Sequence, residues 1–426
     1  MRWRSLRYLR GLTASVALAL GGAITAHAQD GETITLTFAN WATAESATRP
    51  GIEKVIADFE AAHPNIKIES EALSFSEIAR QLVLRVRSGN PPDVAQIAGN
   101  DTILVAATGG LEPLAPYAED GTRDALKPAA LSGLEVEGEL IALPWNLAPA
   151  GFWYNKAIME MAGLDPASPP ATIDELRAAM EAIRESQPDV IPLGMDTTNR
   201  AFALSSNWPW MLTFGAVPIG EQGTGADSEE MKNYLAWMRE LSRKDFIDPG
   251  RKIGEFRPLA AQDKVAFHWD QVLVQGVIQS VNGMSDEAFF DRWGVTTQPV
   301  GSSGESYSFE GGHQLVMFAD SEHKEAAWEF MKHLATSPDA IENYTVSYNA
   351  SLPPLAEVPA SIAGELDTPV FNAFLHEIIP TIAEQPYGPA FAAASTAIMA
   401  GVQEAVTGDK PIDEIAATID QQLDAK

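Results

Sequence analysis

The stretch LPWNLAPAGFWYNK, residues 143–156, decides how the chain is organised. It holds two tryptophans, a phenylalanine, a tyrosine, two asparagines and two prolines in fourteen positions. Pro144 and Pro149 forbid a continuous helix and would interrupt a central strand. The stretch also lacks the regular spacing of Leu and Ile that a core helix uses. It is therefore either an irregular piece of core or a rim where aromatic rings meet a ligand.

Strand and helix patterns alternate before this stretch. Residues 34–38 alternate apolar and polar side chains, which predicts a strand, and the segment 51–62 carries apolar residues at helical spacing. Further strands are expected at 66–70 and 94–97, and SFSE at 74–77 is read as a capping box that opens a helix through Arg87. This alternation predicts an α/β domain with a largely parallel sheet.

The alternation resumes after the stretch. Thr172 and Glu175 form a second expected capping box, and VIPLGMD, KVAFHWD and GGHQLVMFA are expected strands. SSNWPWM, residues 205–211, is read as a loop because of its proline. The sequence contains no internal repeat and no flexible linker, so two domains here would be joined by short strands that cross more than once.

The first 28 residues have the pattern of a secretory signal peptide. Four arginines without an acidic residue precede the short apolar run GLTASVALALGGAI, and the small-residue motif AHA ends at Ala28. The apolar run is too short to span a membrane, and no cysteine stands at the cut for lipid attachment. We expect cleavage after Ala28 and a protein free in the periplasm.

Composition limits the classes of function. Of 426 residues, 398 remain after residue 28, enough for two domains, and the absence of cysteine excludes a disulfide framework. Removing four arginines from the 29 basic residues leaves 25 against 58 acidic ones, a net charge near −33. Such a chain repels nucleic acid and anionic lipid, so neither is an expected partner.

No catalytic or metal-binding motif stands out. The chain lacks a thiol nucleophile, H-E-x-x-H and H-x-H spacings, a G-x-S-x-G elbow, a phosphate-binding P-loop and a dinucleotide-binding glycine motif. We therefore expect no metal, no cofactor and no enzymatic activity. A spatial pair of carboxylates for glycoside hydrolysis stays open, because such a pair leaves no sequence signature.

Polar and aromatic residues gather next to the expected strands, mostly at their ends. Ligands of parallel α/β sheets bind at the carboxyl ends of strands, so these residues are the candidate ligand-binding set. They are Trp41, Asn100, Asp101, Trp145, Asn146, Asp196, Asn207, Trp208, Trp210, His268, Trp269, Asp270, Gly312 and His313.

Tryptophan beside Asn, Asp or His is the composition of a sugar site. The C–H face of a pyranose stacks on an aromatic ring, and its hydroxyl groups need planar polar partners when they are buried. Taken singly, a tryptophan is more often a packing residue. Trp153, Trp237, Trp293 and Trp328 are assigned to packing, Asn155 to a helix cap, and His268 stands between ligand contact and core hydrogen bonding.

A longer segment carries a family resemblance. GELIALPWNLAPAGFWYNKAIMEMAGLDPASPPATIDEL, residues 138–176, resembles the signature of the family 1 extracellular solute-binding proteins of bacterial ABC importers, the family of maltose-binding protein. Supporting pieces follow the family's order: VIADFEAAHPNIKIE, RSGNPPDVAQIAG, GGLEPLAPYAED, GGHQLVMFADSEHKEAAWEFMKHLATSP and GDKPIDEIAATIDQQL.

The resemblance implies a two-lobed periplasmic binding protein fold of type II, the Venus-flytrap arrangement, with about three hinge crossings. These would lie near 143–150, 291–296 and 344–350. The N-terminal lobe would comprise 29–146 plus 293–345, and the C-terminal lobe 147–292 plus 346–426. It also implies a monomer that captures a carbohydrate, mono- or oligosaccharide, between the lobes and delivers it to ABC transporter permease subunits in the inner membrane.

Other ligands stay open at this point. A polyamine would suit Asp101, Asp196, Asp270 and Glu310 beside aromatic rings. A polyol is a further alternative, whereas a phosphate-bearing ligand would need basic residues at strand ends and iron would need clustered tyrosines. From another class, the chain could be an exported glycoside hydrolase.

Overall fold

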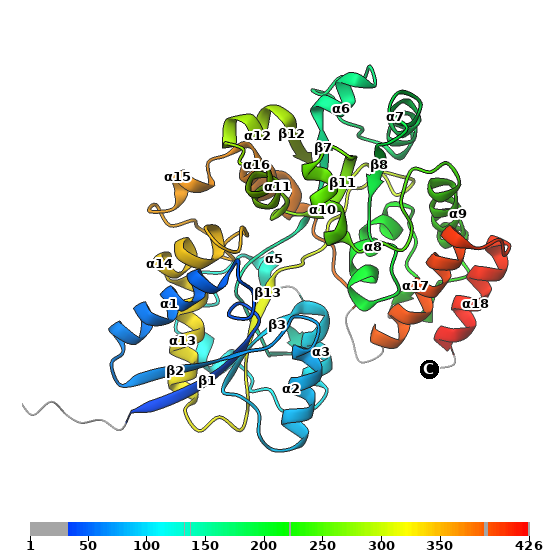
Figure 1. The fold of residues 1–426 in the computed structure, drawn as a ribbon. Coiled ribbons are helices and arrows are strands. Elements are labelled where there is room, and N and C mark those ends of the chain that lie inside the picture. The colour runs from blue at the N-terminus through cyan, green and yellow to red at the C-terminus, as the bar shows by residue number, and fades with distance from the viewer. Residues whose placement is uncertain (1–32, 132, 137, 221–222, 387–390, 425–426) are drawn as a thin grey trace, which may run out of the picture.

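The computed structural model describes residues 33–424 except 132, 137, 221–222 and 387–390, and it shows two α/β lobes (Figure 1). The expected signal peptide, residues 1–28, lies outside the described residues. In the described part of the chain, no helix has the length and apolar character needed to cross a membrane.

The first lobe is built on a five-stranded sheet in the order β2-β1-β3-β13-β6. Its strands are β1 (Ile34–Asn40), β2 (Ile66–Ala72), β3 (Val94–Ala98), β6 (Leu143–Pro144) and β13 (His313–Met317). β1 runs parallel to β2 and β3, whereas β13 is antiparallel to β3 and β6. Pro144 is tolerated in β6 because this strand lies at the edge of the sheet.

The second lobe is built on a four-stranded sheet in the order β12-β7-β11-β8. Its strands are β7 (Ala150–Asn155), β8 (Ile191–Gly194), β11 (Val265–Gln271) and β12 (Trp293–Thr296). β7 is antiparallel to both β11 and β12, and β11 is parallel to β8. All residues of β11 are buried, as expected of a central strand covered on both faces.

Helices cover the first sheet and bury one apolar face each. The main ones are α1 (Arg49–Ala62), α2 (Ile78–Arg87), α3 (Gly99–Ala106) and α13 (Lys324–Thr336). α1 buries Ile52, Val55, Ile56 and Phe59, which confirms the predicted helical face. The capping box predicted at Ser74 and Glu77 is wrong: α2 begins only at Ile78, and its N-cap residue Glu77 makes no side-chain cap hydrogen bond.

The second lobe is mostly helical outside its sheet. Its main helices are α6 (Lys156–Met161), α7 (Ile173–Ser186), α8 (Ala201–Thr213), α9 (Glu229–Arg243), α10 (Ile253–Ala261), α17 (Phe391–Thr407) and α18 (Ile412–Asp424). The predicted capping box of α7 is confirmed, with Thr172 and Glu175 bonded to each other's backbone. The side chain of Asn155 caps α6, also as predicted.

The loop predicted at 205–211 is wrong, because these residues lie inside α8. Pro209 removes one backbone hydrogen bond from this helix. Ten of the thirteen residues of α8 are nevertheless buried, against α17 and α9 among others, and this burial outweighs the lost bond.

The remaining elements are short. They are α4 (Ala115–Ala118), α5 (Pro128–Leu131), β4 (Glu135–Val136), β5 (Glu139–Leu140), β9 (Ile219–Gly220), β10 (Gly223–Thr224), α11 (Val274–Asn282), α12 (Asp286–Arg292), α14 (Pro338–Ala340), α15 (Ala363–Leu366), α16 (Pro369–Ala373), the π-helices η1 (Ile341–Val346) and η2 (Phe374–Ile378), and the 3₁₀-helix η3 (Ile379–Thr381).

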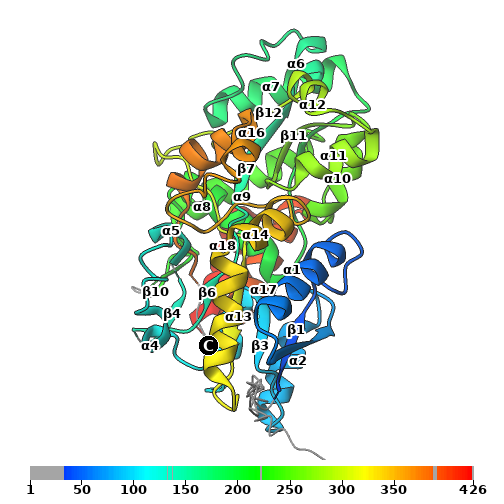
Figure 2. The same cartoon turned by 90° about the vertical axis from the view of Figure 1, so that its left-hand side faces the viewer.

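Three segments connect the lobes near the centre of the molecule (Figures 1 and 2). The first runs from β6 to β7 and the second from Phe309 to β13. The third begins after η1, where the backbones of Leu147 and Leu352 exchange two hydrogen bonds of 2.8 Å, and it reaches the second lobe only at α16. The opening stretch LPWNLAPAGFWYN thus contains β6 of the first lobe, the first crossing and β7 of the second lobe.

Two lobe boundaries differ from the expectation. β12 was expected to start the return to the first lobe, but it pairs with β7, so the second crossing comes more than ten residues later. Residues after 345 do not all join the second lobe either: Leu355, Ile362 and Leu366 pack into the first lobe's core. Both differences arise from pairing between segments far apart in sequence, which local patterns do not reveal.

Candidate functional site

The lobes meet at the carboxyl ends of the first lobe's parallel strands. A small cavity of about 20 Å³ lies there, lined by residues of both lobes and of the second crossing: Phe75, Ala98 and Gly99, then Phe202 and Ser205 of α8, then Phe309 to Gly312. This volume holds about one water molecule. The lobes are therefore in contact here, and a ligand would need them to move apart.

Aromatic rings from both lobes face this contact. Phe75 lies edge-on to Trp41 at 5.2 Å between ring centroids, and Trp41 lies edge-on to His313 at 4.8 Å. Phe202 of α8 packs edge-on to Phe309 at 5.8 Å. Trp41 is only 3% exposed, whereas Phe75 is 38% exposed, so Phe75 presents the accessible aromatic surface on the first lobe's side.

A hydrogen-bond network fixes the protonation of His313. The side-chain oxygen of Gln96 accepts from the backbone N–H groups of Trp41 and Ala42, both at 3.1 Å. Its NH₂ group must therefore face His313, where Nε2 of Gln96 lies 3.0 Å from Nδ1 of the ring. Nδ1 accepts this bond, and burial lowers the pKa of His313 to about 4, so the ring is neutral at pH 7.

Glu310 joins the first and second crossings. Its Oε1 accepts hydrogen bonds from the backbone N–H groups of Ala148 and Gly312. Burial raises the pKa of Glu310 to about 7, although these two bonds act in the opposite direction. Gly312 is required here, because a Cβ at this position would lie 2.0 Å from the carbonyl oxygen of Asn146.

Several buried polar atoms around the cleft have no hydrogen-bond partner. They are Nε1 of Trp145, Nδ2 of Asn146, Oε2 of Glu310 and Oγ of Ser206. Leaving such a group unpaired costs about 1–3 kcal/mol. Glu310 also lines the interlobe cavity, and Asn146 bonds the backbone of His313 beside it, so the interlobe cleft is a candidate ligand site. Asp101, in the first turn of α3, adds a carboxyl whose pKa burial raises to about 6.

The structure brings together only part of the predicted ligand set. Trp41, Asn146, Gly312 and His313 gather at the cleft, linked by ring contacts and by the 3.2 Å bond from the His313 backbone N–H to Asn146. Asp101 lies in the adjacent helix. The side chain of Asn100 lies outside the described residues.

Four of the predicted tryptophan platforms are packed inside a core in this structure. Trp145 stacks on Tyr344 at 4.5 Å and also packs edge-on to Phe38, so it is a core residue. Trp210 and Trp269 are fully buried and pack on each other at 5.5 Å. Trp208 is nearly buried, and its indole N–H donates to the backbone oxygen of Glu384. In each case the large apolar ring completes a core.

The predicted polar residues of the second lobe are already occupied. Asp196 pairs with Arg200 and accepts from backbone and hydroxyl donors. Asn207 bonds three partners inside the core, namely Asp196, Ala203 and Tyr234.

Asp270 accepts two hydrogen bonds from Arg257, at 2.7 and 2.9 Å. His268 is fully buried, and burial lowers its pKa despite Asp270 nearby. Asp196, Asn207 and Asp270 therefore help to hold the second lobe together, whereas neither ring nitrogen of the buried His268 makes a hydrogen bond.

Three cleft residues were not in the predicted set. Phe75 lies in the segment predicted to be a capping box, Phe202 lies in a segment without a prediction, and Glu310 precedes the predicted strand that contains His313. Aromatic side chains in polar segments, SFSE and NRAFA, were the available signal. Among the described residues, no cluster of three or more His, Asp or Glu could hold a metal ion.

Comparison with known proteins now places the chain in a family. The family model described as bacterial extracellular solute-binding protein matches residues 43–341, well over half of the sequence. The chain belongs to this family. The match covers parts of both lobes and the first two crossings, and it leaves out β1 and the chain after residue 341.

Curated relatives are distant. A putative binding protein of Brucella abortus (strain 2308) is 24% identical over 337 residues, which cover 77% of each chain. The sn-glycerol-3-phosphate-binding periplasmic protein of Rhizobium meliloti is 24% identical over 322 residues, covering 72% of this chain and 73% of the relative. A maltotriose-binding protein of Pyrococcus abyssi is 24% identical over 311 residues, covering 72% and 64%.

Solved structures share the fold of this family member. An ABC transporter solute-binding protein of Thermotoga lettingae bound with α-D-tagatose superposes with a TM-score of 0.77 at 22% identity, covering 92% of this chain and all of that one. The maltose-bound T. maritima MalE3 gives 0.79 at 18% identity, covering 92% and 99%. The two-lobed binding-protein fold is thereby shown.

Proposed function

We propose that the protein is the periplasmic substrate-binding component of an ABC importer, a monomer that captures a mono- or oligosaccharide in the interlobe cleft and delivers it to the membrane permease. The observation that carries this proposal is the combination at the cleft of the accessible ring of Phe75 with buried, unpaired donors and acceptors. An aromatic face and a surplus of hydrogen-bonding groups are what a pyranose ring with its hydroxyl groups needs.

Charge supports a neutral ligand over an anionic one. The guanidinium of Arg200, beside Phe202, is paired with Asp196, and that of Arg257 is paired with Asp270. Neither offers a free positive charge. A phosphate group such as that of sn-glycerol 3-phosphate, the ligand named for one relative, would find no uncompensated cation at these positions.

A polyamine is the second candidate, because Asp101 and Glu310 are buried carboxyls beside the cleft. Burial raises the pKa of Asp101 to about 6 and that of Glu310 to about 7. The carboxyls of Asp196 and Asp270 are already paired with arginines. Near neutral pH a part of the Glu310 population is therefore uncharged, which weakens attraction for a polycation and suits hydroxyl groups better.

Closure would couple binding to delivery. A ligand that contacts Phe75 on one lobe and Phe202 on the other stabilises the closed form by the contacts that the open form lacks. The permease would then recognise the closed form. Sugars named for the relatives, maltotriose and maltose among them, fit this ligand class.

A thermal-shift screen of the mature protein tests the proposal. Monosaccharides, maltose, maltotriose, polyols, sn-glycerol 3-phosphate and spermidine would be compared at matched ionic strength. A ligand at a hundredfold excess over its dissociation constant stabilises the folded state by about 2.7 kcal/mol. A shift with a sugar and an intact sugar after incubation supports the proposal. A shift with spermidine alone would replace it with the polyamine reading, and product formation would replace it with a hydrolase.

A further inference from the structure

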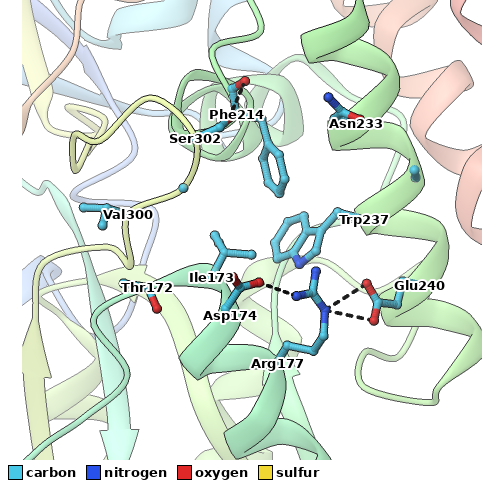
Figure 3. Close-up of a pocket in the computed structure, with 12 residues that line it drawn as sticks. Thr172, Ile173, Asp174, Arg177, Phe214, Asn233, Trp237, Glu240, Val300 and Ser302 are labelled. Carbon is cyan, nitrogen blue, oxygen red and sulfur yellow. Dashed lines mark hydrogen bonds and ion pairs between the residues drawn. The ribbon is translucent and has the colours of Figure 1, made fainter.

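A large cavity of the second lobe lies away from the interlobe cleft. It measures about 650 Å³ and is formed only by the second lobe, between the start of α7, the middle of α9 and the loop at 300–302 (Figure 3). None of its residues lines the interlobe cavity. Its volume is in the range of small-molecule sites, about 300–1,000 Å³.

The wall of this pocket contains an unsatisfied donor. Trp237 of α9 is 3% exposed, and its indole nitrogen has no hydrogen-bond partner. The ring is fixed by stacking on Trp210 at 5.2 Å and by Phe214 at 5.3 Å, so it cannot turn to find a partner elsewhere. Figure 3 shows the nitrogen on the side of the pocket where Arg177 lies.

The charges in the pocket compensate one another. Nε of Arg177 donates to both carboxylate oxygens of Glu240, at 3.0 and 3.1 Å, and Nη1 donates to Asp174. One cation held between two carboxylates gives no site for an anion. Both carboxylates are engaged, Glu240 also with Lys244 at 3.1 Å, so an organic cation is not favoured either.

We propose that this pocket is a second ligand site, separate from the interlobe cleft, for a neutral hydroxylated molecule such as a sugar unit or a polyol. The partly exposed ring of Phe214 and the side chain of Val300 offer apolar surface to C–H groups. The indole N–H of Trp237 and the exposed amide of Asn233 donate to hydroxyl oxygens. The pocket belongs to the second lobe alone, so it stays formed whether the lobes are open or closed.

Indole N–H signals in ¹H–¹⁵N NMR spectra test this site directly. The signal of Trp237 is identified by its loss in Trp237→Phe, a change that keeps an aromatic ring against Trp210 and Phe214. Glucose, maltotriose and glycerol are titrated as neutral probes, with sn-glycerol 3-phosphate and spermidine as charged ones. We expect the Trp237 signal to move saturably with a neutral probe.

Two variants separate the pocket from the cleft. Asn233→Ala alters only an exposed helix position, and we expect it to raise the titration midpoint severalfold without changing the melting temperature. Phe75→Ala alters the cleft, and we expect it to leave the midpoint of the Trp237 signal unchanged. A signal that is unmoved by every neutral probe, that moves only with a charged probe, or whose midpoint follows Phe75→Ala would overturn the proposal.

Discussion

Replacement of Glu310 by glutamine isolates the effect of one buried carboxyl at the hinge. Glutamine keeps an oxygen for the backbone N–H groups of Ala148 and Gly312, so the link between the two crossings persists. It removes only the ionisable group. Oε2, which has no partner in the native side chain, becomes part of a neutral amide.

The expected magnitude follows from the pKa of Glu310. Burial raises it from an ordinary value of 4.5 to about 7. Each unit of difference between folded and unfolded chains is worth about 1.36 kcal/mol, so ionisation costs the native protein about 3 kcal/mol. Because the folded-state pKa is raised, the protonated Glu310 contributes its full share to the free energy of unfolding below about pH 4.5. That contribution is lost as the pH rises through about 7.

Melting temperatures of the native protein and of Glu310→Gln, measured from about pH 4 to pH 9, provide the assay. The two should coincide at the acidic end, and the variant should melt higher at the alkaline end. With an unfolding entropy of about 2.1 cal/mol/K per residue, 3 kcal/mol corresponds to about 4 °C in a chain of this size. Glu305→Gln, at an exposed position in the same segment, is the matched control. Parallel pH profiles for Glu310→Gln and the native protein would refute the reasoning.

Three further predictions concern single side chains. Phe75→Ala should weaken binding of the sugar found in the thermal-shift screen about fivefold, by calorimetry, because an aromatic contact worth about 1 kcal/mol is lost while an exposed ring leaves folding intact. Trp269→Ala should destabilise the protein by about 3–5 kcal/mol in urea unfolding, since it empties a core position; unchanged stability with weaker binding would restore Trp269 as a ligand platform. Thr172→Ala should cost about 1 kcal/mol by removing the capping box of α7, and Thr172→Ser should recover most of it.

Local patterns in the sequence predicted local structure well. The helical spacing of apolar residues up to Phe59 predicted α1, and the pair Thr172 and Glu175 predicted the start of α7. Both depend on residues three or four positions apart, which share one helix face or one turn. The predicted strands at 94–97 and in GGHQLVMFA, residues 311–319, are likewise short apolar runs, and the structure contains them as β3 and β13.

Predictions failed where distant contacts decide. α8 continues through Pro209 because the rest of the lobe buries it, and β12 joins the second sheet because β7 is available as a partner. The role of a tryptophan is hard to predict for the same reason. A large ring beside a polar residue has the same sequence pattern whether it faces a ligand or, as with Trp269, donates from inside a core to the backbone of Ser206.

The insertion of β13 between β3 and β6 sets the order in which the polypeptide can acquire its first lobe. His313 pairs with Ala98, 215 residues earlier in the chain. At about 5–20 residues per second, the ribosome needs on the order of 10 to 45 s to add that length. Throughout that interval β3 has an unpaired edge, which is a template for pairing with another chain. A nascent molecule must therefore be kept from folding or shielded until more than two thirds of it has been made.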